Sequence, residues 1–334
     1  MYPLNMVRFT VLASGSKGNS TVVSGGRTRI LVDCGLSCRE LFRRMKLANE
    51  EPETLDAIVI THEHMDHING IAVTARKLGI PVYFTEATHR AWMRWLTPRR
   101  QMTYAQWLEQ CRKQSAERQA EADAAVEGES DEPEAEQEAE VLAVVAAPEP
   151  AVELDSDRPP SRKEDPTWLP SVEYFQAGQP FEIGDIAVSP FTIPHDAADP
   201  VGFVFRAEGV RMAFATDLGY IPPNVKAQLH GVDLLLLESN HDLEMLRDGP
   251  YPWAVKQRVL SRVGHLSNEA AADYLENSYD GQAAYVILAH LSESNNLPEL
   301  ARVTAERALK GRASLLANRL LLASQQEPLS GINF

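Results

Sequence analysis

The sequence predicts an α/β domain in which two β-sheets pack face to face and helices cover their outer sides. Short apolar strands alternate with helices, and each half of the chain runs through several strands before it ends in a strand followed by a helix. An acidic stretch of low hydrophobicity separates the halves. We see no short-period repeat, so the pattern does not indicate a solenoid or a propeller.

The first half begins with short strands between Gly- and Ser-rich turns. Ser37 and Glu40 form a capping box that predicts a helix over residues 37–45. A second helix should cover residues 67–78 and end at Gly79, and a third should cover residues 86–96. The predicted strands cover residues 7–13, 21–24, 29–32, 57–61 and 81–84.

The second half repeats this arrangement after the acidic stretch. Its strands are apolar runs, of which the most apolar is residues 233–238. The other predicted strands cover residues 186–192, 201–206, 212–216, 284–289 and 314–321, and the predicted helices cover residues 252–263, 267–277 and 297–309.

The net charge of −15 is concentrated in the acidic stretch. Residues 117–157 contain 15 acidic residues and one basic residue, Arg118, which leaves 32 acidic and 31 basic residues elsewhere. Such a segment cannot bury enough apolar surface to offset its ordering entropy. We therefore expect one domain over residues 1–334 with a disordered acidic insertion over residues 109–168. The remainder is almost neutral, so charge does not exclude a polyanionic substrate.

Compartment and membrane association follow from the apolar runs and the cysteines. No run approaches the roughly 18–20 apolar residues that a membrane span requires. The first residues do not have the pattern of a secretion signal. Three cysteines do not make a disulfide framework, and Cys34 and Cys38 are interpreted as small buried thiols rather than metal ligands. These features predict a cytoplasmic protein that is not bound to a membrane.

The strongest chemical signal is His62-Glu63-His64-Met65-Asp66-His67, directly after a predicted apolar strand. Four ligand-type side chains within six residues can converge in a loop at a strand end. Two histidines one residue apart project to one side, and Asp66 and His67 face a second position. The spacing therefore predicts two neighbouring metal sites, and imidazole with carboxylate suits zinc or manganese.

Further ligand-type residues follow other predicted strands. His195 comes after the strand that reaches Ile193, Asp217 follows Thr216, and His290 follows Ala289. One such residue would be unremarkable, but the same arrangement occurs three times. We therefore predict that these three side chains complete the two metal sites.

With these residues the chain resembles the metallo-β-lactamase superfamily over nearly its whole length, excluding the insertion. The resemblance implies a four-layer αββα sandwich with two metal ions at one edge of the sheets. It implies that His62, His64 and His195 hold the first metal, that Asp66, His67 and His290 hold the second, and that Asp217 bridges them. Asp33 matches the family's first aspartate, with the expected role of orienting the histidine-rich loop.

A more specific resemblance is to the YycJ/WalJ-type branch, which implies a nuclease with 5′-to-3′ exonuclease activity on DNA. The motifs that carry it are Leu12-Ala-Ser-Gly-Ser-Lys-Gly-Asn-Ser20, Thr61-His-Glu-His-Met-Asp-His67, Pro194-His-Asp-Ala197, Ala215-Thr-Asp-Leu-Gly219, Leu237-Glu-Ser-Asn-His-Asp242, Gly264-His-Leu-Ser-Asn268 and Leu288-Ala-His-Leu-Ser292. The long acidic insertion departs from this compact pattern.

The implied chemistry is hydrolysis of a phosphodiester. Two divalent cations make a bridging hydroxide available near neutral pH and neutralise the growing charge on phosphate. Asp66 is predicted to take the proton of the water. His265 resembles a histidine of a His-Ser-Thr turn in ribonuclease Z and is predicted to protonate the leaving oxygen, with Glu238 orienting it.

Two segments are candidates for substrate contact. The tight turn from Ser14 to Ser20 offers amides and hydroxyls that can hold phosphate, although Gly/Ser turns between strands are common. The stretch from Arg90 to Arg100 contains arginines and two tryptophans; it predicts either a nucleic-acid contact or a helix with solvated arginines. The residues assigned to phosphate or substrate are Ser14, Ser16, Asn19, Asn240 and Ser267.

Three functions fit these residues. The first is a metal-dependent nuclease acting on nucleic acid, with DNA favoured as the partner. The second is a small-molecule phosphodiesterase or lactonase, because one ligand cage serves many substrates. The third is a non-catalytic metal-binding regulator, which the complete set of seven ligand positions disfavours. The sequence leaves open the metal, the choice between DNA, RNA and a small phosphodiester, the end polarity, the role of the acidic insertion and the oligomeric state.

Overall fold

The computed structural model describes residues 7–97, 165–310 and 319–334. Most of the predicted insertion, residues 109–164, lies outside the described residues, as do Arg99 and Arg100. Residues 165–168, the last of the predicted insertion, are described. The Arg76 guanidinium donates hydrogen bonds to the carbonyl oxygens of Asp165, Pro166 and Trp168, which attaches these residues to the folded unit.

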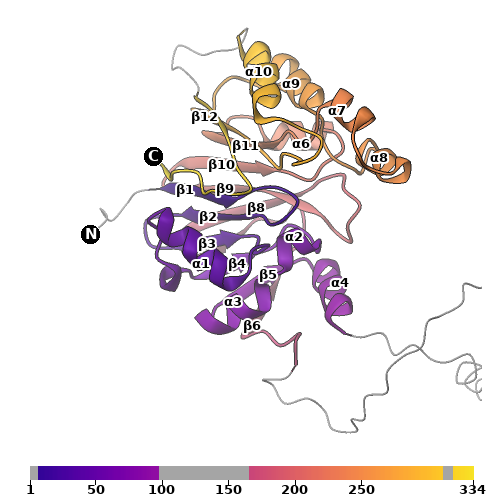
Figure 1. Ribbon diagram of the computed structural model, residues 1–334. Helices are drawn as coiled ribbons and strands as arrows, with labels where there is room; N and C mark the ends of the chain where they lie inside the picture. Colours follow the sequence, from indigo (N-terminus) through magenta and orange to yellow (C-terminus); the bar gives the residue numbers. More distant parts are fainter. Residues whose placement is uncertain (1–6, 98–164, 311–318) are drawn as a thin grey trace, which may run out of the picture. The chain divides into compact units, whose positions relative to one another are not determined.

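Two seven-stranded sheets form the centre of the fold among the described residues (Figure 1). In the first sheet the order is β14-β1-β2-β3-β4-β5-β6, and strands β3 to β6 run parallel. Its strands are β1 (Arg8–Ala13), β2 (Ser20–Ser24), β3 (Arg29–Val32), β4 (Ala57–Val59), β5 (Pro81–Phe84), β6 (Ser171–Tyr174) and β14 (Ile332–Asn333).

The second sheet has the order β13-β12-β11-β10-β9-β8-β7, with strands β10 to β13 parallel. Each sheet thus joins an antiparallel part to a parallel part. Its strands are β7 (Phe181–Ile183), β8 (Ile186–Thr192), β9 (Val201–Ala207), β10 (Val210–Ala215), β11 (Leu234–Glu238), β12 (Tyr285–Ala289) and β13 (Arg319–Leu322).

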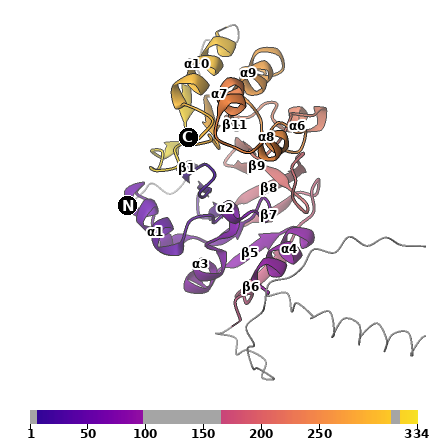
Figure 2. The ribbon, with the colours of Figure 1, turned by 45° about the vertical axis from the view of Figure 1, so that its right-hand side comes forward.

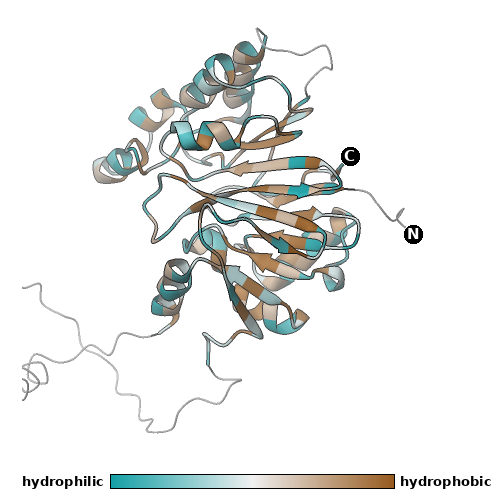
Figure 3. Cartoon of the chain, turned by 180° about the vertical axis from the view of Figure 1, so that it is seen from behind, coloured by the Kyte–Doolittle hydropathy of each residue, from teal (hydrophilic) through white to brown (hydrophobic). Residues whose placement is uncertain are grey.

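Helices cover the outer face of each sheet, and three apolar cores hold the layers together (Figure 2). Phe9, Phe203 and Phe214 belong to the core between the sheets. Hydrophobic residues are frequent along the strands of both sheets (Figure 3). The helices are α1 (Cys38–Leu47), α2 (Met65–Ile68), α3 (Ile71–Leu78), α4 (Glu86–Leu96), α6 (Pro223–Gln228), α7 (Leu243–Asp248), α8 (Trp253–Val259), α9 (Asn268–Asn277) and α10 (Pro298–Leu309), with a 3₁₀ turn at Pro52–Thr54. The predicted four-layer αββα sandwich is confirmed.

Several local predictions hold, and the prediction for residues 67–78 is wrong. The Ser37 hydroxyl accepts a hydrogen bond from the Glu40 amide and caps α1, and α3 ends before Gly79 as predicted. The single helix predicted over residues 67–78 is two helices, α2 and α3. The chain breaks between them because the Gly70 amide donates to the Cys34 carbonyl, at 2.7 Å, instead of to the carbonyl one helical turn earlier.

Candidate metal centre

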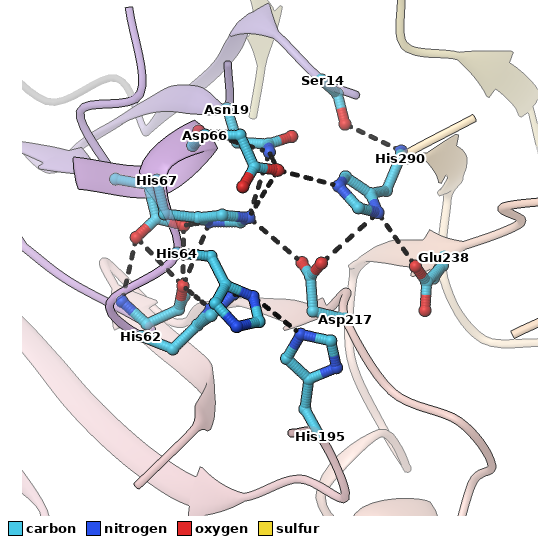
Figure 4. Close-up of polar contacts among 12 residues, drawn as sticks. Ser14, Asn19, His62, His64, Asp66, His67, His195, Asp217, Glu238 and His290 are labelled. Atoms are coloured by element: carbon cyan, nitrogen blue, oxygen red, sulfur yellow. Dashed lines mark hydrogen bonds and ion pairs between the residues drawn. The ribbon is translucent and has the colours of Figure 1, made fainter. Parts of the chain in front are cut away.

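The centre lies where the parallel strands of both sheets end. Asp33 follows β3, Asp217 follows β10, and His290 follows β12. All three have left-handed backbone conformations, with φ values of 58°, 60° and 56°. Residues other than glycine rarely adopt this conformation, and the strain it stores is often found at functional sites. The fold bends the chain sharply at each of these strand ends, and the Asp217 and His290 side chains point to a common centre (Figure 4).

His62, His64 and His195 form the first candidate ligand cluster. His62 Nε2 lies 3.1 Å from His64 Nδ1, and His195 Nε2 lies 3.2 Å from the same atom. Three ring nitrogens therefore point at one another without a carboxylate between them. Burial lowers the pKa of His62 well below its ordinary value, and the neighbouring imidazoles of His67 and His195 lower it further. Burial also lowers the pKa of His195. Neutral imidazoles are the form that binds a metal ion.

Asp66, His67 and His290 form the second cluster. Asp66 Oδ2 lies 3.4 Å from His67 Nε2 and 3.4 Å from His290 Nε2. Asp217 lies between the clusters: its Oδ2 is 3.5 Å from His67 Nε2, and its Oδ1 is 3.4 Å from His290 Nδ1. His62, His67 and Asp217 also present ligand atoms within 4.8 Å of one another. The structure thus brings together all seven side chains predicted as metal ligands (Figure 4).

The charges of the centre fit a divalent cation. Asp217 is 2% exposed, and its Oδ2 has no hydrogen-bond partner among the described residues. Burial alone would lower the pKa of His67, but Asp66, Asp217 and Asp33 raise it well above its ordinary value. A group of buried carboxylates that favours a positive charge, with one carboxylate oxygen that accepts no hydrogen bond, is suited to hold a metal ion.

Asp33 and Thr61 fix the orientation of the His67 ring. His67 Nδ1 donates to Asp33 Oδ2 at 2.8 Å, which leaves Nε2 facing Asp66 and Asp217. The Thr61 hydroxyl lies 2.9 Å and 3.0 Å from the two Asp33 oxygens and 3.0 Å from His62 Nδ1. This is the geometry expected of the role assigned to Asp33. The contribution of Thr61 was not predicted, although the residue directly precedes His62 in the sequence.

Glu238 holds two histidines with one carboxylate. Its Oε1 accepts from His265 Nδ1 at 2.7 Å and from His290 Nδ1 at 2.9 Å, and its Oε2 accepts the amides of Leu218 and Leu266. Burial opposes a charge on His265, but the Glu238 carboxylate raises the pKa of that imidazole. His265 is thereby kept able to carry a proton at the edge of the candidate centre.

The residues predicted to bind phosphate mostly support the ligands. The Ser14 hydroxyl accepts from the His290 amide at 2.8 Å, and Asn19 Nδ2 donates to Asp66 Oδ2 at 3.1 Å. Asn240 Nδ2 donates to the His290 carbonyl, and the Ser267 hydroxyl caps α9 by accepting from the Ala270 amide. Ser16 is exposed.

The backbone amides of the turn before β2 also donate their hydrogen bonds to groups of the protein itself. Those of Ser14, Gly15, Lys17 and Gly18 donate respectively to the Ser324 carbonyl, the Asn19 side chain, Gln325 and the Gly15 carbonyl. The expectation of an open phosphate nest there is therefore wrong for these four amides. The turn instead positions Asn19 and Ser14.

The aromatic stretch of α4 divides into a buried part and an exposed part. Trp92 is 2% exposed and packs against Phe84 and His89, so it belongs to the core rather than to a surface for stacking bases. Arg90 pairs with Glu86, and Trp95 is 66% exposed. The burial of Trp92 therefore favours a helix with an apolar face over a nucleic-acid contact at this residue.

Gly35 permits the close approach that places Asp66. A Cβ atom at this position would lie 1.7 Å from the Asp66 carbonyl oxygen and 2.7 Å from the Asn19 amide nitrogen. We expect Gly35→Ala to destabilise the fold by about 3 kcal/mol and to weaken metal binding, because the backbone of Asp66 must move. Urea unfolding and metal titration measure both effects. Gly79→Ala is the control: nothing lies within 4 Å, so a cost of only about 1 kcal/mol from its left-handed backbone is expected, with metal affinity unchanged.

The family model of the metallo-β-lactamase superfamily matches residues 13–277. The chain belongs to the metallo-β-lactamase superfamily. Within the superfamily it is 32% identical to exodeoxyribonuclease YycJ of Bacillus anthracis over 304 residues, which cover 91% of this chain and 89% of that protein. It is also 32% identical to exodeoxyribonuclease WalJ of Streptococcus pneumoniae strain D39, with 89% of this chain and 86% of that protein covered. These relatives place the chain in the YycJ/WalJ-type branch and make it a metal-dependent hydrolase.

Solved metallo-β-lactamase structures share the fold. YhfI of Bacillus subtilis is 15% identical with a TM-score of 0.58, covering 97% of this chain and 99% of that chain. The short form of human tRNase Z is 14% identical with a TM-score of 0.52, covering 97% and 98%. At such low identity, the likeness concerns the fold of this superfamily member and not its substrate. Within the described residues, no helix is both long and apolar enough to span a membrane.

Proposed function

We propose that this protein is a metal-dependent nuclease that hydrolyses phosphodiester bonds of DNA as a 5′-to-3′ exonuclease and works with two divalent ions, zinc or manganese. The proposal depends on one observation: a complete set of seven converging ligand side chains, in a chain that resembles exodeoxyribonucleases over nine-tenths of its length. The free buried thiols of Cys34 and Cys38 are in keeping with action in the cytoplasm.

The metal assignment follows the clusters. His62, His64 and His195 would hold one ion, Asp66, His67 and His290 the other, and Asp217 would serve both. When bound, two divalent ions supply a nucleophilic water near neutral pH and neutralise charge on the attacked phosphate.

The protein's own residues supply orientation and proton transfer. Asp33 and Thr61 orient the His67 ring so that Nε2 faces Asp66 and Asp217. Asp66 would take a proton from the attacking water. His265, protonated and held by Glu238, is placed to give a proton to the leaving oxygen.

A nuclease assay on end-labelled DNA and RNA, each single- and double-stranded, tests the function. We expect cleavage of DNA that stops on chelation and returns when Mn²⁺ or Zn²⁺ is added. A 5′-labelled strand should release labelled mononucleotide from the start, whereas a 3′-labelled strand should shorten progressively. Increasing salt should weaken binding of the polymer steeply. Turnover of a lactone or a small phosphodiester, without cleavage of any polymer, would replace this proposal by the small-molecule alternative.

A further inference from the structure

Residues 253–264, which are α8 and the turn after it, are fixed directly to the candidate metal centre. His195 Nδ1 donates to the Gly264 carbonyl at 3.1 Å, and the Asp196 amide donates to the Val263 carbonyl at 3.0 Å. The His265 amide donates to the Val259 carbonyl at 3.0 Å. A ligand residue and the proposed proton donor therefore both hold this segment in place.

Helix α8 packs little of its surface against the rest of the fold. None of its residues is buried, and it lies at the outer edge of the molecule beside α7 (Figure 1). Trp253 is 67% exposed, and Leu260 and Val263 are 50% and 44% exposed. Surface helices normally bury an apolar face against the core, so exposed apolar side chains beside a reaction centre indicate a surface that contacts another molecule.

The segment is basic. It contains Lys256, Arg258 and Arg262 and no acidic residue. Arg258 forms an ion pair with Asp196, which neutralises the carboxylate next to His195. Lys256 Nζ donates to the Arg247 carbonyl, and the Arg262 guanidinium carbon lies 4.3 Å from the centre of the Tyr220 ring. Among the described residues, no carboxylate lies within ion-pair distance of Lys256 or Arg262, although Lys256 is near enough to Asp248 to help lower the pKa of that carboxyl. Both cations can therefore still contact a partner of opposite charge.

Arg262 is held in a fixed position relative to the candidate ligands. Gly219, two residues after Asp217, packs so closely that a Cβ atom there would lie 2.4 Å from the Arg262 carbonyl carbon. The next residue, Tyr220, carries the stacked guanidinium. Stacking leaves the N–H edge of a guanidinium available, and that edge matches a phosphate group.

We propose that Tyr220, Trp253, Lys256 and Arg262 form a strand-binding rim that holds single-stranded nucleic acid as it enters the metal centre. Lys256 and Arg262 contact backbone phosphates, Tyr220 positions Arg262, and Trp253 stacks on a base. Exposed aromatic and cationic side chains in this combination bind single strands without sequence preference. The inference rests on the proposed function, because only a polynucleotide substrate needs such a rim at this site.

Binding of a fluorescent single-stranded thymidine 20-mer with phosphorothioate linkages, measured at several salt concentrations, tests the rim. Each phosphate contact to a single strand contributes about 0.7 to the slope of log affinity against log salt. The double variant Lys256→Ala/Arg262→Ala should therefore lower the slope by about 1.4. Trp253→Ala should weaken binding roughly tenfold or more and leave the slope unchanged. Tyr220→Ala should weaken binding, and Tyr220→Phe, which keeps the ring, should restore it.

Arg27→Ala is the matched control, because Arg27 is exposed in the turn between β2 and β3, at the opposite end of the strands from the centre. Its slope should equal that of the unmodified protein. If unmodified protein cleaves DNA but the rim variants bind with the same affinity and slope, the inference is wrong and the nuclease stands. If unmodified protein cleaves no polymer, the proposed function itself fails. If the rim variants lose binding to phosphatidylglycerol vesicles but bind the oligonucleotide as the unmodified protein does, the surface is a membrane contact and the inference of a strand-binding rim is wrong.

Discussion

Asp217→Ala should reduce DNA cleavage by roughly 10³-fold or more and lower the bound metal content. Asp217 is buried between His67 and His290, and one of its oxygens lacks a hydrogen-bond partner among the described residues. Its loss would leave the two proposed metal positions without the carboxylate they share. Replacing a residue that only hydrogen-bonds to a metal ligand typically lowers metal affinity 10–100-fold. Replacing a ligand shared by both ions should therefore lower metal affinity by more than about 100-fold. Elemental analysis after dialysis and a metal titration measure it.

Asp56→Ala is the control for this substitution. Asp56 is exposed and accepts a hydrogen bond from the Arg29 amide at the other end of the parallel strands. The same chemical change at that position should leave metal content and cleavage rate unaltered. Full metal content together with full activity in Asp217→Ala would show that the seven-ligand assignment is wrong.

His265→Ala should leave metal content unchanged and slow DNA cleavage by about 10²–10⁴-fold, the usual contribution of a general acid or base. His265 donates to Glu238 through Nδ1, and its ring centre lies 5.2 Å from those of His195 and His290. It is thus close to the candidate ligands, while its bonded carboxylate keeps the imidazole able to carry a proton. Single-turnover kinetics on a 5′-labelled strand measure the chemical step.

The leaving group separates proton donation from other roles of His265. A 4-nitrophenyl ester of thymidine 5′-phosphate releases a phenolate that needs no proton, so its hydrolysis should fall far less in His265→Ala than DNA cleavage does. Equal losses on both substrates would contradict the role of proton donor. Loss of metal would instead make His265 a ligand, which its position within 4.8 Å of Asp217, Glu238 and His290 allows.

The seven proposed ligands could be predicted from the sequence because four of them cluster within six residues after one apolar strand and the other three each follow an apolar strand. Parallel strands bring such ends to one edge of a sheet, so a linear pattern becomes a cluster in space. The left-handed backbone of Asp33, Asp217 and His290 could not be predicted in this way. Asp and His adopt this conformation more often than most residues, but whether they do so at a given strand end depends on the packing around it.

The supporting residues were harder to interpret. A serine or asparagine near a centre can face a substrate or hold a neighbouring backbone, and the sequence does not distinguish these. Ser14 and Asn240 both bond to the backbone of His290. Similarly, β6 and β7 were missed because they are short, only partly buried edge strands with little apolar periodicity.

The contacts of Ser14 and Gln325 have a consequence for the newly made chain. The Ser14 hydroxyl is bonded to a residue 276 positions later, and the Lys17 amide to Gln325, 308 positions later. Strand β14 pairs with β1, at the other end of the described chain. A polypeptide still attached to the ribosome cannot close these contacts until Gln325 and β14 have emerged. The proposed ligands can therefore reach their final arrangement only after the segment that carries Gln325 and β14 has left the ribosome, so hydrolytic activity should appear late in the synthesis of this domain.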